Sequence, residues 1–448
     1  MSAALSPSVL AQLSTFIAAR MGLNFPQERW GDLARCIEAA ARARGLRDAT
    51  EYVQWLLTSP LSRREIEMLA SHLTVGETYF FRDKRSFDLL ETKVLPELIQ
   101  ARRNTTRRLR IWSAGCCTGE EPYSVAMLLD RMIPDIADWN VTLLATDINP
   151  RFLENAAAGV FGEWSFRAVP PGIRERYFSS LHGRRMQIAR HIRKMVTFSL
   201  LNLAEETYPS VVNNTNAMDL VLCRNVLMYF TPDQAARVVG NLHGALSQNG
   251  WLLVAPSETS HAFLKSFSLV SFPDAIFYRK TEQIEPLRLP EWHAPQEETP
   301  PARAPAAQWS VSRDITEMES PTLMARRLAN EGNLVESLAW CDKAVLSEPL
   351  DPAHRFLRAM VAQELGMLEE AMKSLRHALY LDQDFIMAHY ALGTLARKLG
   401  RHALWRRHFR SARGLLERLE PDDPLAESAG ITAGRLMEII GSTADGEA

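Results

Sequence analysis

The feature that most constrains the fold is a repeat of 34 residues in the last third of the chain. Small residues recur at this spacing in three sets, which are Gly332, Gly366 and Gly400; Ala344, Ala378 and Ala412; and Ala325, Ala359 and Gly393. Small residues at fixed positions let two antiparallel helices approach closely, and a glycine permits the turn between them. The spacing therefore predicts an all-α array of stacked helix pairs, with a plain helical bundle of coincidental spacing as the alternative.

The period resembles that of tetratricopeptide repeats, and we place this region at 321–425. Trp405 stands where the repeat usually has a small residue, so we expect the third unit to be distorted or to act as a cap. Stacked helix pairs form a groove suited to peptides or helices. We therefore expect the repeats to bind a further protein partner, with dimerisation and covering of an active site as alternatives.

A proline-rich, acidic stretch at 281–320 precedes the repeats. It contains six prolines, and eight acidic residues against three arginines. Such a composition predicts an extended linker. We expect this linker to be long enough for the repeats to lie well away from the rest of the protein.

The chain before the linker divides into a helical part, placed at 1–90, and an α/β part, placed at 91–280. Val9, Leu13 and Ile17 fall on one helical face, and Ser62 with Glu65 matches a capping box. From residue 109 onward, apolar segments alternate with helical patterns; these segments are LRIWSAG, VTLLATD, KMVTFSL, MDLVLCRN and GWLLVAPS. The alternation predicts a mainly parallel sheet covered on both faces.

Charge and composition exclude several classes of protein. With 51 Lys+Arg and 53 Asp+Glu the net charge is −2, which disfavours a generally basic nucleic-acid-binding protein. No uncharged apolar run reaches the roughly 18 to 20 residues of a membrane-spanning helix, and no signal-peptide pattern precedes the first apolar stretch. The five cysteines lack CxxC spacing. We expect a cytoplasmic protein with no metal site, no nucleic-acid partner and no direct membrane insertion.

A turn with two glycines follows the first predicted strand. Gly115 and Gly119 would let a ligand approach the backbone at the carboxyl end of that strand, where open α/β sheets bind ligands. Asp147 ends the next strand, and a carboxylate there can accept hydrogen bonds from ribose hydroxyls. The GxGxxG pattern is absent, so a dinucleotide site is weakly supported. Glu121 has two interpretations, a cofactor contact or a capping box with Thr118.

Five segments of the chain are ETYFFRD (77–83), WSAGCCTGEEPYS (112–124), ATDIN (145–149), NL (202–203) and CRNVLMYF (223–230). In this order and spacing they resemble the chemoreceptor glutamate O-methyltransferases of the CheR family, and the similarity covers about 10–280. It implies an α/β fold with an N-terminal helical domain and a Rossmann-like methyltransferase domain that binds S-adenosylmethionine (SAM). It also implies a small antiparallel β insertion near 180–197, S-adenosylhomocysteine (SAH) as product, and the cytoplasmic domain of a methyl-accepting chemoreceptor as partner.

The resemblance implies that eight residues line the SAM pocket, which are Thr78, Arg82, Glu121, Asp147, Asn202, Leu203, Asn225 and Val226. It further implies that Arg82 and Tyr229 stand closest to the reacting groups and act in catalysis. Two positions depart from the family pattern. Gly76 replaces an asparagine, which removes one cofactor hydrogen bond or leaves it to water. Ala255-Pro256-Ser257-Glu258 replaces G-H-S-E, so the role of that histidine does not carry over.

These residue types suit methyl transfer to a carboxylate. A glutamate with a pKa near 4.3 is ionised at neutral pH and attacks the sulfonium methyl without a general base. Arg82 can clamp the carboxylate through two parallel hydrogen bonds, and Tyr229 can orient an oxygen or present its ring to the cation. The alternatives are an ordinary surface arginine and a core aromatic side chain.

Charge is uneven along the chain and bears on partners. Residues 1–110 hold 17 Lys+Arg against 12 Asp+Glu, a balance of +5. A basic helical face that includes Arg35, Arg42, Arg44 and Arg47 would attract a glutamate-bearing receptor helix; a solvated face is the alternative.

Two other functions stay open. One is methylation of a small molecule, which the helical domain and ETYFFRD disfavour, and the other is a catalytically weak scaffold or regulatory protein of a chemosensory complex.

Overall fold

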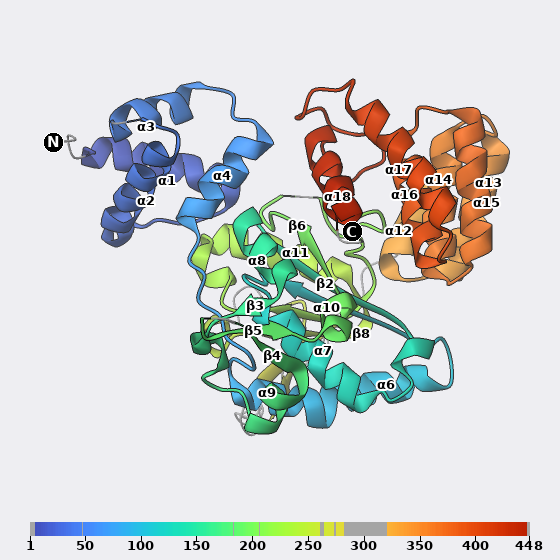
Figure 1. Cartoon of the computed structure of the whole chain (residues 1–448), viewed down its shortest axis with the longest axis horizontal. Helices are drawn as coiled ribbons and strands as arrows, with labels where there is room; N and C mark the ends of the chain where they lie inside the picture. The colour runs from blue at the N-terminus through green and yellow to red at the C-terminus, as the bar shows by residue number, and fades with distance from the viewer. Residues whose placement is uncertain are drawn as a thin grey trace, which may run out of the picture.

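The computed structural model describes residues 5–46, 48–181, 183–205, 207–259, 264–272, 275–281 and 320–445. N-terminal helices, a central α/β part and a C-terminal stack of helices follow one another along the chain (Figure 1). The predicted linker at 281–320 falls almost entirely outside the described residues. In the described part of the chain, no helix combines the length and the apolar character needed to cross a bilayer.

The N-terminal part is a bundle of α1 (Pro7–Met21), α2 (Trp30–Ala43), α3 (Ala49–Thr58) and α4 (Arg63–Leu73). Leu13 and Ile17 of the predicted α1 face are fully buried in its core. The predicted capping box is present, because the Ser62 side chain accepts from the Glu65 backbone and the Glu65 side chain accepts from the Ser62 backbone. The helical character of this part is confirmed.

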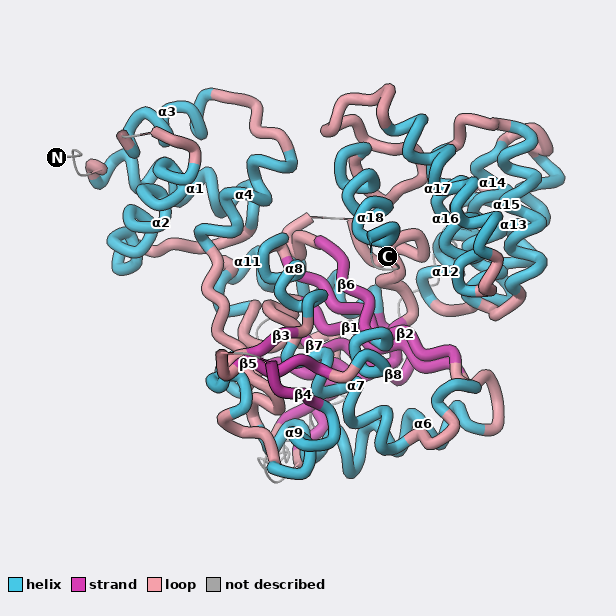
Figure 2. The backbone as a smooth tube through the Cα atoms, viewed as in Figure 1, coloured by secondary structure: helices cyan, strands magenta, loops and turns pink. Residues whose placement is uncertain are grey.

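The central sheet has seven strands in the order β6-β2-β1-β7-β8-β10-β9 (Figure 2). Its strands are β1 (Arg108–Ala114), β2 (Asn140–Asp147), β6 (Val196–Leu200), β7 (Met218–Cys223), β8 (Leu246–Val254), β9 (Ser268–Ser271) and β10 (Ile276–Arg279). The first five are parallel and correspond to the five predicted segments, whereas β10 and β9 add an antiparallel edge. The mainly parallel sheet is confirmed.

Helices cover both faces of the sheet, because neighbouring side chains of each strand point to opposite cores. In β1, Ile111 packs into one hydrophobic cluster and Trp112 into the other. The helices of this part are α5 (Lys84–Leu89), α6 (Leu95–Arg103), α7 (Glu120–Met132), α8 (Pro150–Ala158), α9 (Pro171–Tyr177), α10 (Arg190–Met195) and α11 (Pro232–Ala245). Asn149 caps α8 and Thr231 caps α11, with proline at the first turn of each helix.

The β insertion is present but lies earlier than expected. Strands β3 (Val160–Phe161), β5 (Arg185–Ile188) and β4 (Phe178–Leu181) form a small antiparallel sheet in this order. The prediction of 180–197 was therefore wrong at both ends. Residues 190–195 form α10, and Val196 begins the edge strand of the main sheet.

The C-terminal part consists of three helix pairs and a final helix, α12 (Pro321–Glu331), α13 (Leu334–Ser347), α14 (Pro352–Glu364), α15 (Leu368–Leu381), α16 (Ile386–Lys398), α17 (His402–Leu416) and α18 (Ala433–Asp445). Gly332, Gly366 and Gly400 take left-handed backbone angles at the turn inside each pair, which explains their recurrence. Tetratricopeptide repeats are confirmed. In the third pair Trp405 is buried beside Phe409, and α18 follows α17, so the third pair is not the last helical element of the chain.

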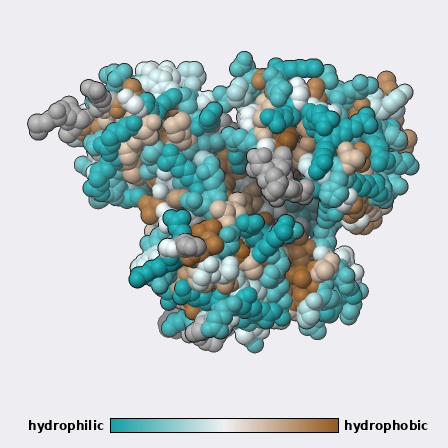
Figure 3. Space-filling model, viewed as in Figure 1, coloured by the Kyte–Doolittle hydropathy of each residue, from teal (hydrophilic) through white to brown (hydrophobic). Residues whose placement is uncertain are grey.

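The repeats pack directly on the α/β part, at the end of the sheet where the strands begin. Glu364 of α14 forms ion pairs with Arg108 at 2.9 Å and Arg110 at 2.5 Å, both on β1. The Asn216 side chain donates to the Ala329 carbonyl at 2.9 Å. The N-terminal helices and the repeats form two mostly hydrophilic lobes (Figure 3). The expectation that the repeats lie well away was wrong, because this interface holds them.

Candidate active site

A cavity of about 300 Å³ opens at the other end of the sheet, where the parallel strands finish and the N-terminal helices meet them. Every residue predicted for the cofactor or for catalysis lines this cavity; these are Thr78, Arg82, Glu121, Asp147, Asn202, Leu203, Asn225, Val226 and Tyr229. They come from segments that are up to about 150 positions apart in the sequence. The parallel topology brings them together because the carboxyl ends of parallel strands meet at one edge.

Asp147 ends β2, and the residue is buried, with 9% of its surface exposed. One oxygen accepts the Cys117 backbone N–H and the other accepts the Asn149 backbone N–H, each at 2.9 Å. Burial raises the pKa of Asp147 to about 6, although these backbone donors act in the opposite direction. A carboxylate has about four acceptor positions, so two remain for hydroxyl groups of a ligand.

The glycine turn after β1 lies close to the opposite wall of the cavity. Gly115 has φ +82°, and a Cβ built there would lie 2.4 Å from Cγ2 of Val226. Only glycine fits this contact, so the turn and the Val226 segment form a narrow part of the cavity. At Gly115 the close neighbour is a side chain of the protein, so the approach of a ligand to this backbone stays a prediction.

Glu121 does not form the alternative capping box with Thr118. The helix begins at Glu120 after Gly119, and Thr118 donates to the Glu120 side chain instead, at 2.6 Å. The Glu121 carboxylate accepts from Ser113 at 2.7 Å and from the guanidinium of Arg224 at 3.1 Å. Glu121 is therefore a cavity residue that two partners hold in place.

Arg224 is a functional candidate that the sequence analysis missed. Its side chain is 2% exposed, donates to the Arg82 carbonyl at 2.7 Å and lies 3.5 Å from the Asp83 carboxylate. It thus ties the ETYFFRD segment to Glu121 across the cavity wall. The signal was present, since Arg224 follows a fully buried strand inside the CRNVLMYF segment.

Glu258 holds the loop after β7 in shape. Its carboxylate accepts the backbone N–H groups of Asn225 at 2.7 Å and Met228 at 3.2 Å. Asn225 has φ +59°, a conformation that asparagine tolerates better than most residues. The glutamate of the Ala255-Pro256-Ser257-Glu258 segment therefore positions the cavity loop, and the missing histidine has no counterpart there.

Asn202 and Leu203 line the cavity beside the end of α1. The Asn202 amide donates to the Arg20 carbonyl at 3.2 Å, and its oxygen accepts the Ala204 backbone N–H at 3.0 Å. Asn202 therefore links the sheet to the N-terminal helices as well as facing the cavity.

Arg82 and Tyr229 both reach the cavity with reactive atoms that are largely free. Arg82 donates to the Glu77 carbonyl at 2.6 Å, and it forms no ion pair with the described residues. The Tyr229 hydroxyl makes no hydrogen bond to any residue that the structure describes. Both groups are consequently available to an incoming molecule.

The N-terminal helices complete the cavity, which the sequence analysis did not foresee. Met21 and Phe25 line it, the Asn24 backbone N–H donates to the Tyr229 carbonyl at 2.7 Å, and the Arg29 guanidinium lies 5.8 Å from the Tyr229 ring centre. No motif in this region indicated these contacts, because they depend on how the helical part docks on the sheet.

Gly76 leaves no room for the asparagine that the family usually has at this position. A Cβ at Gly76 would lie 2.7 Å from Cζ of Phe152 and 3.3 Å from the sulfur of Cys117. Phe152 itself lines the cavity. In this chain an aromatic ring therefore occupies the space next to position 76.

Neither cysteine at the cavity is suited to act as a nucleophile. Burial raises the pKa of Cys117 to about 12, and burial likewise raises the pKa of Cys116 well above its ordinary value, with Asp147 adding to both effects. Both thiols stay protonated at neutral pH.

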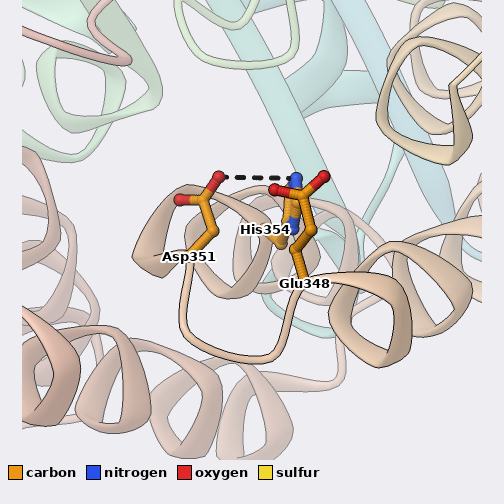
Figure 4. A group of neighbouring side chains, drawn as sticks. All are labelled: Glu348, Asp351 and His354. Atoms are coloured by element: carbon orange, nitrogen blue, oxygen red, sulfur yellow. Dashed lines mark ion pairs between the residues drawn. The ribbon is translucent and has the colours of Figure 1, made fainter.

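Three side chains far from the cavity could in principle surround a cation. Glu348, Asp351 and His354 face one another at the turn between α13 and α14 (Figure 4). Nε2 of His354 lies 2.8 Å from the Thr322 hydroxyl and 3.6 Å from Asp351, and Asp351 also caps α14. These contacts give the group a structural role at the turn.

The comparisons with known proteins identify the family. The family model "CheR methyltransferase, SAM binding domain" matches residues 76–276. A chemotaxis protein methyltransferase of Borreliella burgdorferi is 31% identical over 252 residues, which cover 56% of this chain and 87% of that protein. The chain belongs to the CheR methyltransferase family. It is an enzyme of the SAM-dependent methyltransferases.

Two further relatives differ in how much of the chain they match. Chemotaxis protein methyltransferase 1 of Pseudomonas aeruginosa is 34% identical over 239 residues, covering 52% of this chain and 84% of that protein. A protein of the same organism named "Probable biofilm formation methyltransferase WspC" is 28% identical over 426 residues, covering 89% of this chain and 97% of its own length. Because the latter match covers 89% of this chain, it extends beyond the methyltransferase part into the repeats.

The residues of the cavity fit the cofactor of this family. Asp147 keeps two acceptor positions for ribose hydroxyls, and a cavity of about 300 Å³ lies at the low end of ligand-pocket volumes. The cavity also contains apolar side chains that can cover a base, among them Phe152 and Leu203.

The basic N-terminal face is weaker than its composition indicated. Arg35 pairs with Asp32, Arg42 lies 4.0 Å from Glu38, and Arg44 lies 3.0 Å from Glu65. Arg47 lies outside the described residues. A receptor helix would therefore meet partly neutralised arginines.

Proposed function

We propose that this enzyme transfers the methyl group of SAM to glutamate side chains in the cytoplasmic domain of a methyl-accepting chemoreceptor, releasing SAH. The convergence of Asp147, Arg82 and Tyr229 on one cavity carries the proposal. All three side chains line this cavity, and their chemistry supports the proposal, because a carboxylate suits ribose hydroxyls whereas a guanidinium and a phenol suit an anionic acceptor.

SAM supplies an activated methyl group on a positively charged sulfur, so the protein has to supply binding and alignment. Asp147 and Asn202 would hold the nucleoside end, with Thr78, Leu203, Asn225 and Val226 shaping the rest of the cavity. Arg82 would clamp the receptor glutamate, and Tyr229 would orient one of its oxygens. Alignment of this kind lowers a barrier by several kcal/mol, with upper estimates of about 7 to 11 kcal/mol.

Glu121 and Arg224 would act as positioning residues. Arg224 fixes the backbone of Arg82 through the carbonyl oxygen, and Glu121 neutralises the charge of Arg224 in a buried place. The guanidinium of Arg82 then remains the free cation on this wall of the cavity among the described residues. Such fixed donors need no reorganisation during the reaction.

A second candidate is a catalytically weak scaffold of a chemosensory complex, which the Gly76 position keeps open. Phe152 lies next to the position where the family usually has an asparagine, so one cofactor hydrogen bond would be missing or supplied by water. The active methyltransferase and the scaffold would have the same fold and would differ in the rate of methyl transfer.

The test is transfer of labelled methyl from SAM to a purified receptor cytoplasmic fragment, followed by mild alkali. We expect alkali-labile label that is released as methanol, because a carboxyl methyl ester hydrolyses whereas an N-methyl group does not. Label that resists alkali would contradict the proposal. Absence of transfer with intact SAM binding would favour the scaffold.

A further inference from the structure

A hollow on the repeats, remote from the active site, carries a separate function. It has a volume of about 750 Å³ and lies between α15 and α17, with the turn at 382–384 at one end. We call it the basic groove, because four arginines line it, Arg376, Arg407, Arg410 and Arg418.

The four arginines have no ion-pair partner among the residues that the structure describes, and all four are exposed. Several other arginines of the repeats have an acidic partner, whereas Arg355, Arg397 and Arg406, which lie outside the groove, have no ion pair among the described residues either. Arg326, Arg358 and Arg401 pair with Glu427, Asp342 and Glu369, respectively. Asp384 is the one carboxylate that lines the groove, so its charge is strongly positive within a protein whose total is −2.

The groove also has an apolar floor and an aromatic rim. Leu379, Leu404 and Leu415 line it, and the Tyr380 ring on its edge is 84% exposed. A Cβ at Gly414 would meet no atom within 4 Å, so the groove is open above α17. An exposed tyrosine beside free arginines is the composition of an interface hot spot.

Two histidines form the wall between α16 and α17. His389 and His408 lie with their Nδ1 atoms 2.9 Å apart. The pKa of His408 is lowered to about 4, first by burial and then by the neighbouring His389, Arg407 and Arg376. Arg376 on α15 and Arg407 on α17 therefore both lower the pKa of His408, although they come from different helices. A carboxylate placed there would relieve this mutual repulsion.

The inner face of the repeats is less accessible than the basic groove. The segment after α17 returns along it, since Glu427 pairs with Arg326 on α12 and α18 packs against α17 with Leu436 fully buried. Figure 1 shows α18 beside the stacked repeats, on the side toward the N-terminal helices. The outer groove is therefore the more open surface for a partner.

We propose that the basic groove binds an acidic segment of a partner protein, with carboxylates on the four arginines and an apolar side chain on the leucine floor. This goes beyond the proposed function, and it specifies the chemistry of the further protein partner that the sequence predicts for the repeats. The excess of positive charge in the groove favours a negatively charged segment as its ligand. A nucleic acid is a poorer match, because the positive charge is confined to one hollow and does not form an extended track.

The test measures fluorescence anisotropy of two labelled octapeptides with the intact protein in the absence of SAM. One peptide alternates pairs of glutamate with leucine, and the other has glutamine in place of glutamate. We expect saturable binding of the glutamate peptide, weakened by salt, and no binding of the glutamine peptide. The double variant Arg376→Glu/Arg407→Glu should weaken binding at least about tenfold.

The matched control is Lys373→Glu/Lys398→Glu, which changes the charge of the same repeats by the same amount outside the groove. It should bind the peptide within about twofold of the unchanged protein. The milder variant Arg410→Gln/Arg418→Gln guards against misfolding, which circular dichroism monitors. Equal binding by all variants, or tighter binding of single-stranded DNA than of the peptide, would overturn the proposal. Failure of methyl transfer would leave this result unaffected, because binding is measured without SAM.

Discussion

Arg110 of the sheet and Glu364 of the repeats form a buried ion pair that joins the two parts of the chain, with 2.5 Å between the guanidinium and the carboxylate. Arg110 is 0% exposed, and its remaining N–H groups donate to Asn214 and Asn216. Burial alone would raise the pKa of Glu364, but Arg110 and Arg108 outweigh burial and hold the pKa below its ordinary value. The repeats are therefore a built-in part of the enzyme.

Glu364→Gln should destabilise the docked protein by about 3 to 5 kcal/mol, because two arginines are left without a counter-charge in a buried place. Urea denaturation and thermal unfolding measure the effect. Glu369→Gln is the control, since Glu369 pairs with Arg401 at the surface and should cost about 0 to 1 kcal/mol. Because the pKa of Glu364 is lowered on folding, its contribution is present above the unfolded pKa and is lost as the pH falls through the folded value. Equal stability of both variants would contradict the claim that the buried ion pair of Glu364 stabilises the docked repeats.

Cofactor affinity should depend on pH through Asp147. With a pKa of about 6, this carboxylate is ionised at pH 7.5 and able to accept two hydroxyl donors, but its protonation removes acceptor positions. Affinity for SAH should therefore fall as the pH drops below about 6, by up to about tenfold per unit. Calorimetry over this pH range measures it. The Asp147→Asn variant should bind SAH more weakly, and its affinity should no longer depend on pH in this range. If the affinity of that variant still falls below pH 6, a group other than Asp147 causes the pH dependence.

Tyr229→Phe and Arg82→Ala should each lower methyl transfer at least about tenfold while the protein stays folded. Both line the cavity, and Tyr229→Phe keeps the aromatic ring that packs against the N-terminal helices. Initial rates with a receptor fragment measure the effect, and SAH binding by Tyr229→Phe should change little. Tyr380→Phe is the matched control, because that tyrosine is exposed on the repeats. Full activity in both cavity variants would reject these assignments.

Gly76→Asn should weaken SAH binding at least about tenfold, because the new side chain meets the Phe152 ring at 2.7 Å from its Cβ. The double variant Gly76→Asn/Phe152→Ala should recover affinity, since it opens the space that the ring fills. Phe152→Ala alone serves as the control. Gly76→Asn binding as tightly as the unchanged protein would show that the ring moves aside freely.

Much of this architecture follows from local sequence patterns. The 34-residue spacing, the five apolar segments and the caps at Ser62, Asn149 and Thr231 were predictable because each depends on neighbouring residues. The CheR resemblance located all nine predicted cavity residues, since strand ends converge in a parallel sheet. The extra helix α18 and the edge hairpin β9–β10 had no comparable signal.

What the sequence did not predict depends on docking between distant segments. In the sequence, Arg110 is a charged residue within a predicted strand, with no sign of a partner. Its burial is explained only by the packing of α14, which brings Glu364 against β1. The same holds for Asn24 at Tyr229 and for Phe152 at Gly76, which meet across separate elements. The composition of a linker indicates how far the repeats can lie from the α/β part, but it does not indicate the surface on which they dock.

The central claim is that the cavity between the N-terminal helices and the sheet holds SAM or its product. Isothermal calorimetry of the intact chain with SAH tests it most directly. The account predicts saturable binding of one SAH per chain that Asp147→Asn weakens at pH 7.5. A folded protein that gives no binding heat across temperatures, and no shift of its melting point with excess SAH, would contradict it.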